Sequence, residues 1–119
     1  MLSFISTRFK RVLTAIKGMF HLIKTEASIQ SHLLIFSLFI FLGFYVDLDV
    51  NDWIKQIMIF GFIIPIEALN TGIEKICDFT NPDYNKKIGF IKDVSAGSVS
   101  FAVIASLIAI VLIYYPYLF

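Results

Sequence analysis

Hydrophobic residues recur every three or four positions between Phe4 and Ile23, which is the spacing of an amphipathic helix. The apolar positions are Ile5, Phe9, Val12, Leu13, Ile16, Met19, Phe20 and Ile23. The gaps hold the cations Arg8, Lys10, Arg11, Lys17 and Lys24. Such a helix suits a membrane surface, where its cations face lipid phosphates, although a solvated helix on a soluble partner has the same local pattern. The sequence predicts a helix over about residues 4–25, and the apolar runs that follow favour the membrane surface.

Three apolar runs follow, and each predicts a membrane-spanning helix. The first, about 31–48, is somewhat short for the roughly 20 residues that a bilayer needs. The second, about 53–79, would be roughly 42 Å long, which exceeds the hydrocarbon core, so its last turns must leave the lipid or lie inside an assembly. The third, about 94–116, ends among interfacial tyrosines and opens with small residues that allow close packing, namely Ser95, Ala96, Gly97, Ser98 and Ser100.

Polar segments separate these runs. The first connection is an acidic turn that contains Asp47, Asp49, Asn51 and Asp52. Residues 81–87 combine proline, asparagine and charge, as a loop does, and the last helix is expected to begin at Asp93 or Ser95. Asp78, near the end of the second run, is interpreted as part of a solvated helix end that pairs with Lys75.

The composition indicates an all-α membrane protein with one domain over residues 1–119. The chain is 58% hydrophobic, has a mean hydropathy of +0.82 and carries 16% charged residues, against roughly 25% in soluble domains. A chain this short cannot enclose two large ligand pockets alone, so an oligomer with shared sites is expected. The single cysteine, Cys77, excludes an intramolecular disulfide, and no zinc-ligand spacing or cleaved signal peptide is recognisable.

The distribution of cations predicts the topology. Nine of the ten Lys and Arg residues lie before the first span or around the second connection, and only Lys55 lies near the acidic turn. By the positive-inside rule, the N-terminus and the polar loop are cytoplasmic, whereas the acidic turn and the C-terminus are outside.

Three polar side chains at the end of the second run form the candidate site. Glu67, Asn70 and Glu74 are spaced three and four residues apart, so they share one helix face. An acid at membrane depth costs roughly 2.5–3.5 kcal/mol, which makes it a functional candidate by default. By the predicted topology, Glu26 lies on the same side of the membrane as these three residues. The neighbouring pair Lys92 and Asp93 lies there as well. All of the candidate reactive side chains are therefore expected on the cytoplasmic side of the membrane.

These groups are the components of phosphoryl transfer. Two carboxylates with free water positions suit Mg²⁺ shared with substrate phosphates, and a lysine beside it neutralises phosphoryl charge. The chain has no GxxxxGK[ST] loop, GxGxxG turn, HRD or DFG sequence. A small pore, or a proton- or cation-coupled transporter that uses Glu67 and Glu74, is the alternative, but a transport glutamate usually lies near the midplane, whereas these acids cluster at one interface.

The stretch EALNTGIEKICDFTNPDYNKKIGFIKDVSAGSV resembles the prokaryotic membrane kinases of the diacylglycerol kinase and undecaprenol kinase family. The family's hallmark is E-x-L-N-[ST]-A-I-E, a polar loop, and A-K-D followed by small residues. The segment KTEASIQSH and the three-span layout extend the resemblance over nearly the whole chain. It implies a homotrimer with shared active sites in the bacterial inner (cytoplasmic) membrane, with ATP and a membrane lipid as substrates, Mg²⁺ as cofactor and no nucleic-acid partner.

The resemblance also implies roles for individual residues. Glu67 matches the catalytic base, which takes the proton of the lipid hydroxyl as that oxygen attacks the γ-phosphate of ATP. Glu26 and Glu74 match the carboxylates that hold Mg²⁺ with the nucleotide, and Asn70 matches a supporting asparagine. The other implied nucleotide contacts are Asp83, Tyr84, Asn85, Lys92 and Asp93. The lipid hydroxyl is expected near Ser31, His32 and Glu67.

The chain departs from the family pattern at a few positions. Gly72 replaces the usual alanine, and Pro65 is expected to remove a backbone hydrogen bond just before Glu67 and to bend the helix. Thr14 stands where an aromatic residue is common, which leaves an adenine contact there undefined. His32 follows the Ser-x-x-x-His pattern of the undecaprenol kinase branch, which tilts the expected substrate toward the polyprenol.

Overall fold

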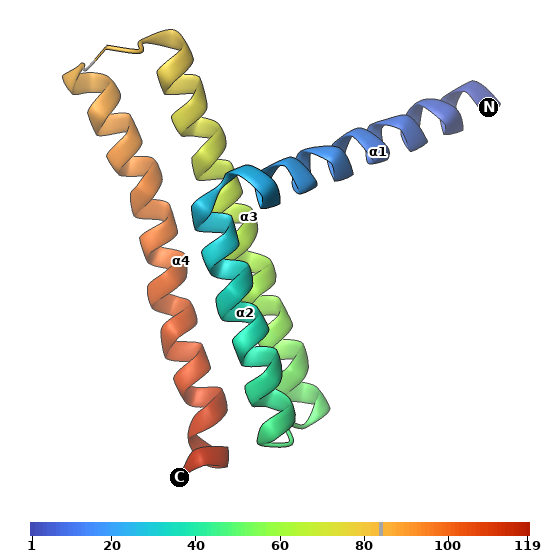
Figure 1. Ribbon diagram of the computed structural model, residues 1–119, viewed down its shortest axis with the longest axis vertical. Coiled ribbons are helices and arrows are strands. Elements are labelled where there is room, and N and C mark those ends of the chain that lie inside the picture. Colours follow the sequence, from blue (N-terminus) through green and yellow to red (C-terminus); the bar gives the residue numbers. More distant parts are fainter. Residues whose placement is uncertain (84) are drawn as a thin grey trace.

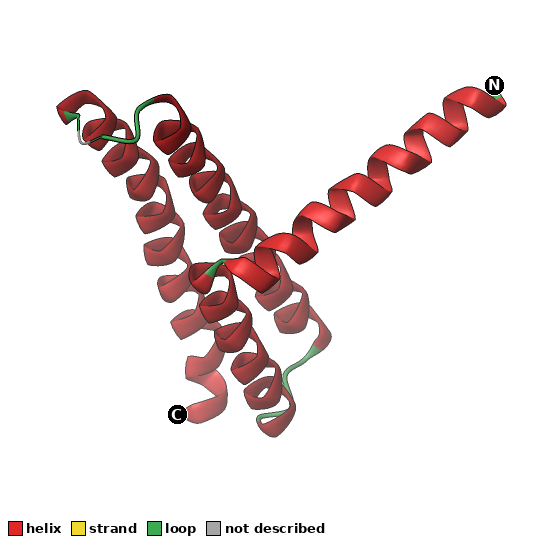
Figure 2. Cartoon of the chain, turned by 45° about the horizontal axis from the view of Figure 1, so that its top comes forward, coloured by secondary structure: helices red, strands yellow, loops and turns green. Residues whose placement is uncertain are grey.

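The computed structural model describes residues 1–83 and 85–119, and it contains four helices joined by short connections (Figures 1 and 2). They are α1 (Leu2–Thr25), α2 (Ala27–Tyr45), α3 (Val50–Thr80) and α4 (Lys86–Leu118). Tyr84, a predicted nucleotide contact, lies outside the described residues.

The helices α2, α3 and α4 form a bundle in which α3 packs against both of the others. The first helix, α1, touches the bundle at its junction with α2 and projects away from it (Figure 1). The bundle therefore positions any site between helices, while most of α1 remains free of it.

Each helix of the bundle is long and apolar enough to cross a membrane. Large apolar side chains cover the outside of the bundle, including Phe41, Phe62 and Leu112. An apolar exterior around hydrogen-bonded helices is what a bilayer requires. The prediction of a multi-pass membrane protein with three apolar helices is confirmed.

Two polar side chains define where α3 and α4 begin. Asp49 accepts a hydrogen bond from the Asp52 amide at 2.9 Å, and Asn85 accepts one from the Lys87 amide at the same distance. Such caps satisfy backbone donors that a helix leaves free. The prediction that the last helix begins at Asp93 or Ser95 is wrong, because the Asn85 cap starts α4 at Lys86.

The connection between α2 and α3 is tight. Asp47 has a positive φ of 59°, a conformation that aspartate tolerates better than most residues. One turn earlier, a Cβ on Gly43 would lie 2.7 Å from the ring of Trp53. Glycine at position 43 therefore allows Trp53 to close the α2–α3 corner.

A buried polar network ties the three bundle helices together in the half next to this corner. Gln56 of α3 is 0% exposed and donates to the backbone carbonyl of Phe39 in α2 at 3.1 Å. The single O–H of Tyr114 in α4 is shared between the amide oxygen of Gln56 and the same carbonyl, whose oxygen lies 3.1 Å from the hydroxyl oxygen. These bonds satisfy polar groups that would otherwise be costly to bury.

Candidate active site

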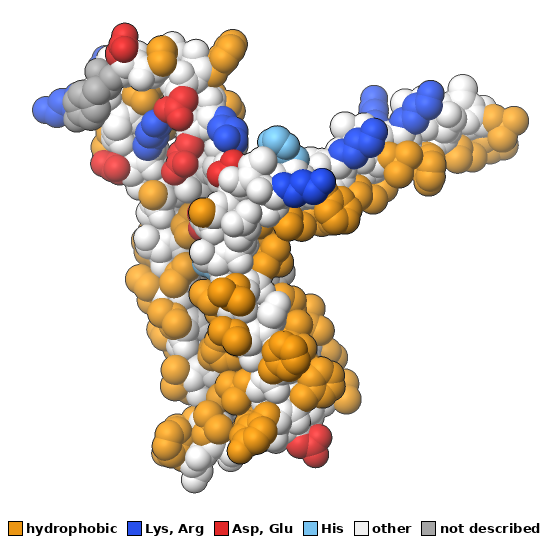
Figure 3. All heavy atoms as spheres, in the orientation of Figure 1, with side chains coloured by type: hydrophobic (Ala, Val, Ile, Leu, Met, Phe, Trp, Pro, Cys, Tyr) orange, Lys and Arg blue, Asp and Glu red, His pale blue; other side chains and the backbone are white. Residues whose placement is uncertain are grey.

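Charged side chains gather at the end of the bundle where α3 passes into α4, close to the α1–α2 junction, whereas the visible body of the bundle is largely apolar (Figure 3). The candidate residues of α3 lie in its last four turns, which lead into this end. The helix runs without interruption through Pro65, so Glu67 and the later polar residues remain on one continuous helix.

Glu67 of α3 lies against His32 of α2. The distance between Oε2 of Glu67 and Nε2 of His32 is 3.3 Å. Both groups are largely removed from solvent, with side-chain exposures of 10% for Glu67 and 18% for His32. The structure therefore brings together two of the three residues predicted to surround the lipid hydroxyl. The third, Ser31, is exposed, and its hydroxyl donates to the Ala27 carbonyl within α2.

A second set of contacts connects α3 to α4 through Asn70. The hydroxyl of Ser95 donates to Oδ1 of Asn70 at 2.7 Å, and Nδ2 of Asn70 donates to Oε1 of Glu74 at 3.2 Å. Ser95 and Asn70 are each 7% exposed. Because a hydroxyl that donates must face the carbonyl oxygen of the amide, Ser95 fixes which way the Asn70 side chain points. Ser95 thereby orients the donor that reaches Glu74.

Sequence reasoning missed Ser95, which it grouped with small residues that favour close packing. One signal was present: Ser95 lies three residues after Lys92, so the two share a face of one helix. Its contact with Asn70 places this face of α4 against the polar face of α3.

Glu26 is the single non-helical residue between α1 and α2. Its Oε1 lies 3.2 Å from Nζ of Lys75, the residue that follows Glu74 on α3. The Gln30 side chain braces the same junction by donating to the carbonyls of Ile23 and Lys24. The ion pair thus draws the predicted metal ligand Glu26 toward the turn of α3 that carries Glu74.

Lys92 of α4 pairs with Asp78 of α3. The prediction that Asp78 pairs with Lys75 is therefore wrong, because each residue finds its partner on another segment: Lys75 on Glu26 and Asp78 on Lys92. These inter-segment pairs replace the simple solvated helix end expected from sequence.

The remaining predicted nucleotide contacts are not joined to this cluster. Asn85 caps α4 through bonds to the amides of Lys87 and Ile88. Asp83 and Asp93 are exposed, and no side-chain hydrogen bond or ion pair connects them to other residues in the described ranges. These residues are close to the polar cluster in sequence, but among the described residues their side chains make no hydrogen bond or ion pair with it.

The donor set suits a hard cation that arrives with a phosphate ligand. Within residues 1–83 and 85–119, no group of three or more His, Cys, Asp and Glu side chains could hold a metal ion by itself. Mg²⁺ ordinarily keeps several waters and takes only one or two protein carboxylates together with substrate phosphates. Glu26 and Glu74, both half-buried, match that requirement in kind and number.

An apolar groove runs along the bundle from His32. Its lining comes from α2 (His32, Ile35, Phe39), α3 (Ile59, Phe60, Ile63) and α4 (Val103, Ser106, Leu107, Ile110). The volume of about 100 Å³ is below the roughly 300–1,000 Å³ of a pocket for a complete small molecule. The groove therefore fits a stretch of hydrocarbon chain, with the His32–Glu67 pair at one end.

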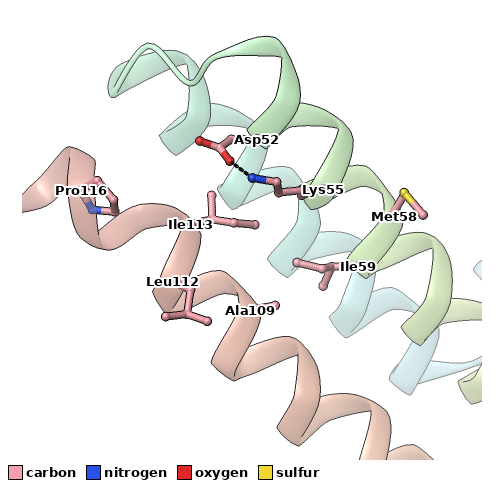
Figure 4. Close-up of a pocket in the computed structure, with 8 residues that line it drawn as sticks. All are labelled: Asp52, Lys55, Met58, Ile59, Ala109, Leu112, Ile113 and Pro116. Carbon is pink, nitrogen blue, oxygen red and sulfur yellow. Dashed lines mark hydrogen bonds and ion pairs between the residues drawn. The ribbon is translucent and has the colours of Figure 1, made fainter.

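A wider hollow lies between the first turns of α3 and the last turns of α4 (Figure 4). Its polar side chains are committed to contacts with protein: Asp52 bonds Lys55 at 2.8 Å and the Tyr117 hydroxyl at 2.7 Å. Asp52 and Glu67 are about 22 Å apart along α3, given a rise of 1.5 Å per residue. This hollow is therefore separate from the acidic site.

Comparison with known proteins finds a family model and a relative that each match most of the chain. Residues 13–114 match the family model described as prokaryotic diacylglycerol kinase. The chain is also 32% identical over 109 residues to the undecaprenol kinase of Bacillus subtilis (strain 168). The aligned region covers 91% of this chain and 88% of that protein.

Proposed function

Because this chain belongs to the prokaryotic diacylglycerol kinase family and is a lipid kinase, we propose that it transfers the γ-phosphate of ATP to the hydroxyl of undecaprenol. Membership of a kinase family sets aside the pore and the transporter as functions of the acidic cluster. The observation that carries the choice of acceptor is the contact between Glu67 and His32 at the end of an apolar groove.

The groove suits a polyprenol better than a diacylglycerol. Only His32 and Ser106 contribute polar side chains to its lining. A diacylglycerol carries two ester groups beside its hydroxyl, and these would lose hydrogen bonds to water without gaining protein donors in such a groove. The chain of a polyprenol is hydrocarbon up to its hydroxyl. The similarity to an undecaprenol kinase supports the same choice.

Glu67 acts as the general base in this proposal. The lipid oxygen attacks the γ-phosphorus, the bond from phosphorus to the β–γ bridging oxygen breaks, and ADP leaves. The proton of the hydroxyl passes to the Glu67 carboxylate, whose position next to the groove lets it reach the head of the lipid. Burial of Glu67 behind α2 keeps bulk water from competing for the phosphoryl group.

The nucleotide phosphates would lie between the Glu26–Lys75 pair, Glu74 and Lys92. Glu26 and Glu74, together with the phosphates, would hold Mg²⁺, which would supply charge neutralisation during transfer. Asn70, oriented by Ser95, holds one oxygen of Glu74 and leaves the other for this role. Lys92 exchanges Asp78 for phosphate oxygens. Asp83 and Asn85, which precede α4, and Asp93, which lies within it, are the further proposed contacts of the nucleotide. The resemblance adds Tyr84 to this set.

In this proposal the protein lies in the bacterial inner (cytoplasmic) membrane, with its N-terminus and active site in the cytoplasm and its C-terminus outside, as the distribution of Lys and Arg predicts. The underside of α1 is apolar and its upper side carries Lys and Arg (Figure 3), which suits a helix lying on the membrane surface. A homotrimer with shared sites would complete the nucleotide pocket, because one chain leaves the polar end open to solvent.

Competition between the two lipids tests the proposed acceptor. The purified protein is supplied with γ-labelled ATP, Mg²⁺ and equimolar undecaprenol and diacylglycerol in one membrane mimic. We expect most of the label in undecaprenyl phosphate. Label mainly in phosphatidic acid would overturn the choice of lipid, and label in neither product would overturn the proposed reaction.

Covalent crosslinking of active protein tests the proposed trimer. A monomer that retains activity would contradict active sites shared between subunits.

A further inference from the structure

The two oxygens of the Glu67 carboxylate have different surroundings. Oε2 lies 3.3 Å from Nε2 of His32. Among the described residues, no hydrogen-bond donor reaches Oε1. One oxygen of the carboxylate is therefore held by protein, and the other is available to a ligand.

His32 belongs both to this pair and to the apolar groove. Its ring lines the groove with Ile35 and Phe39 of the same helix, and it meets Glu67 across the α2–α3 interface. In the tautomer whose Nε2 carries the hydrogen, the ring donates to Oε2. Few other polar groups are close: Ser31 bonds its own helix, and Asn70 is engaged with Ser95 and Glu74.

We propose that His32 is a positioning residue for the base: it holds Oε2 of Glu67 so that Oε1 faces the lipid hydroxyl at the end of the groove. The inference rests on the proposed lipid kinase reaction and deepens it. Without the imidazole, the carboxylate can rotate about its last side-chain bond, and its productive orientation becomes one among several. Because geometry at the reacting atoms controls the rate, the loss falls on turnover rather than on nucleotide affinity.

The reaction remains balanced with His32 in this role. The proton of the lipid hydroxyl ends on Oε1 of Glu67, while His32 keeps its own hydrogen in the bond to Oε2. After transfer, the protonated carboxyl returns its proton to water as the site opens. His32 thus neither gains nor loses a proton in the chemical step.

The decisive comparison uses two replacements of similar size. His32→Leu removes the donor and keeps the apolar volume, whereas His32→Gln places an amide donor close to the position of Nε2. We expect His32→Leu to lower kcat by roughly 10- to 100-fold, with the KM for MgATP within about twofold of wild type. His32→Gln should restore kcat to within about threefold of wild type, because the donor to Oε2 is retained.

His21→Leu is the matched control, because His21 is exposed on α1 and has no part in the site. It should leave both parameters unchanged. A fluorescent ATP analogue measures nucleotide binding in each variant and shows that the site has formed. If His32→Leu does not fold, His32→Asn replaces it, since the shorter amide cannot reach Oε2.

Two results would overturn the positioning role. One is a kcat for His32→Leu equal to that of wild type, and the other is an equal loss in His32→Gln and His32→Leu. In both cases the wild type still labels lipid, so the proposed reaction stands. A wild type that labels no lipid would instead remove the proposed reaction, and the role of His32 with it.

Discussion

Lys92 and Asp78 form an ion pair between α4 and α3, one helical turn beyond Glu74. The lysine predicted to bind phosphate is therefore paired with a carboxylate in this structure. Both side chains are substantially exposed, at 36% for Lys92 and 63% for Asp78. An exposed pair of this kind contributes only about 0.2–1 kcal/mol, so phosphate oxygens can displace Asp78 readily.

Replacing Asp78 tests this competition. Asp78→Asn should lower the KM for MgATP by up to about fivefold, because Lys92 no longer has to leave a partner before it binds phosphate. Lys92→Gln should raise the same KM. Initial rates over a range of MgATP concentrations measure both effects. A rise in KM for Asp78→Asn would show instead that Asp78 helps to bind the nucleotide.

The bond from Ser95 to Asn70 predicts that Ser95, which has no proposed contact with the phosphates, nevertheless affects nucleotide binding. Ser95→Ala leaves Oδ1 of Asn70 buried without its donor, which costs about 1–3 kcal/mol and frees the amide to rotate. We expect a higher KM for MgATP and a lower thermal stability. Ser100→Ala is the control, because that exposed serine bonds only within α4, to the Ala96 carbonyl. Equal behaviour of the two variants would exclude an orienting role for Ser95.

Substitution of each glutamate of α3 should impair a different step of the reaction. Glu67→Gln removes the proposed base, so turnover should fall more than about tenfold, or 1.4 kcal/mol of barrier, while nucleotide binding changes little. Glu74→Gln should weaken Mg²⁺ and ATP binding as well, because it removes a proposed metal ligand. Mg²⁺ titrations of activity and of nucleotide binding separate the two. Retention of more than about a tenth of wild-type turnover in Glu67→Gln would remove Glu67 from the role of base.

The Tyr114 hydroxyl, which belongs to the buried network in the other half of the bundle, should contribute to stability but not to chemistry. Tyr114→Phe removes the hydroxyl that contacts Gln56 and Phe39, and we expect the free energy of unfolding to fall by about 1–3 kcal/mol. Activity per folded molecule should not change, because the direct bond from Gln56 to Phe39 remains. Tyr115→Phe alters the exposed neighbouring residue and should leave stability unchanged. Unfolding in a membrane mimic measures the difference.

Local patterns were sufficient to predict the helices. Periodic apolar residues and long uncharged runs depend only on neighbours in sequence, and they placed one N-terminal helix and three spans. The start of α4 was missed because Lys86 and Lys87 read as part of a polar loop, whereas Asn85 caps a helix that includes them. A capping residue followed by two lysines and an apolar run is compatible with a loop or with the start of a helix. Packing against α3 then favours the helix.

The pairing of charged residues could not be predicted in the same way. Lys75 and Asp78 are close enough on one helix to interact, so the sequence suggests that they do. In the folded chain, Glu26 at the α1–α2 junction and Lys92 on α4 offer other partners. Similarly, Glu67 and His32 were both expected near the lipid hydroxyl, but their direct contact depends on the register between α2 and α3.

That register connects the two halves of the bundle. Gln56 and Glu67 belong to α3, and their respective partners Phe39 and His32 belong to α2. A slip of one turn would move α2 by about 5.4 Å along α3 and separate His32 from Glu67. The bond from Gln56 to the Phe39 carbonyl resists that slip. A substitution at Gln56 that leaves the chain inserted and helical should therefore impair phosphorylation, although Gln56 lies about 16 Å along α3 from Glu67.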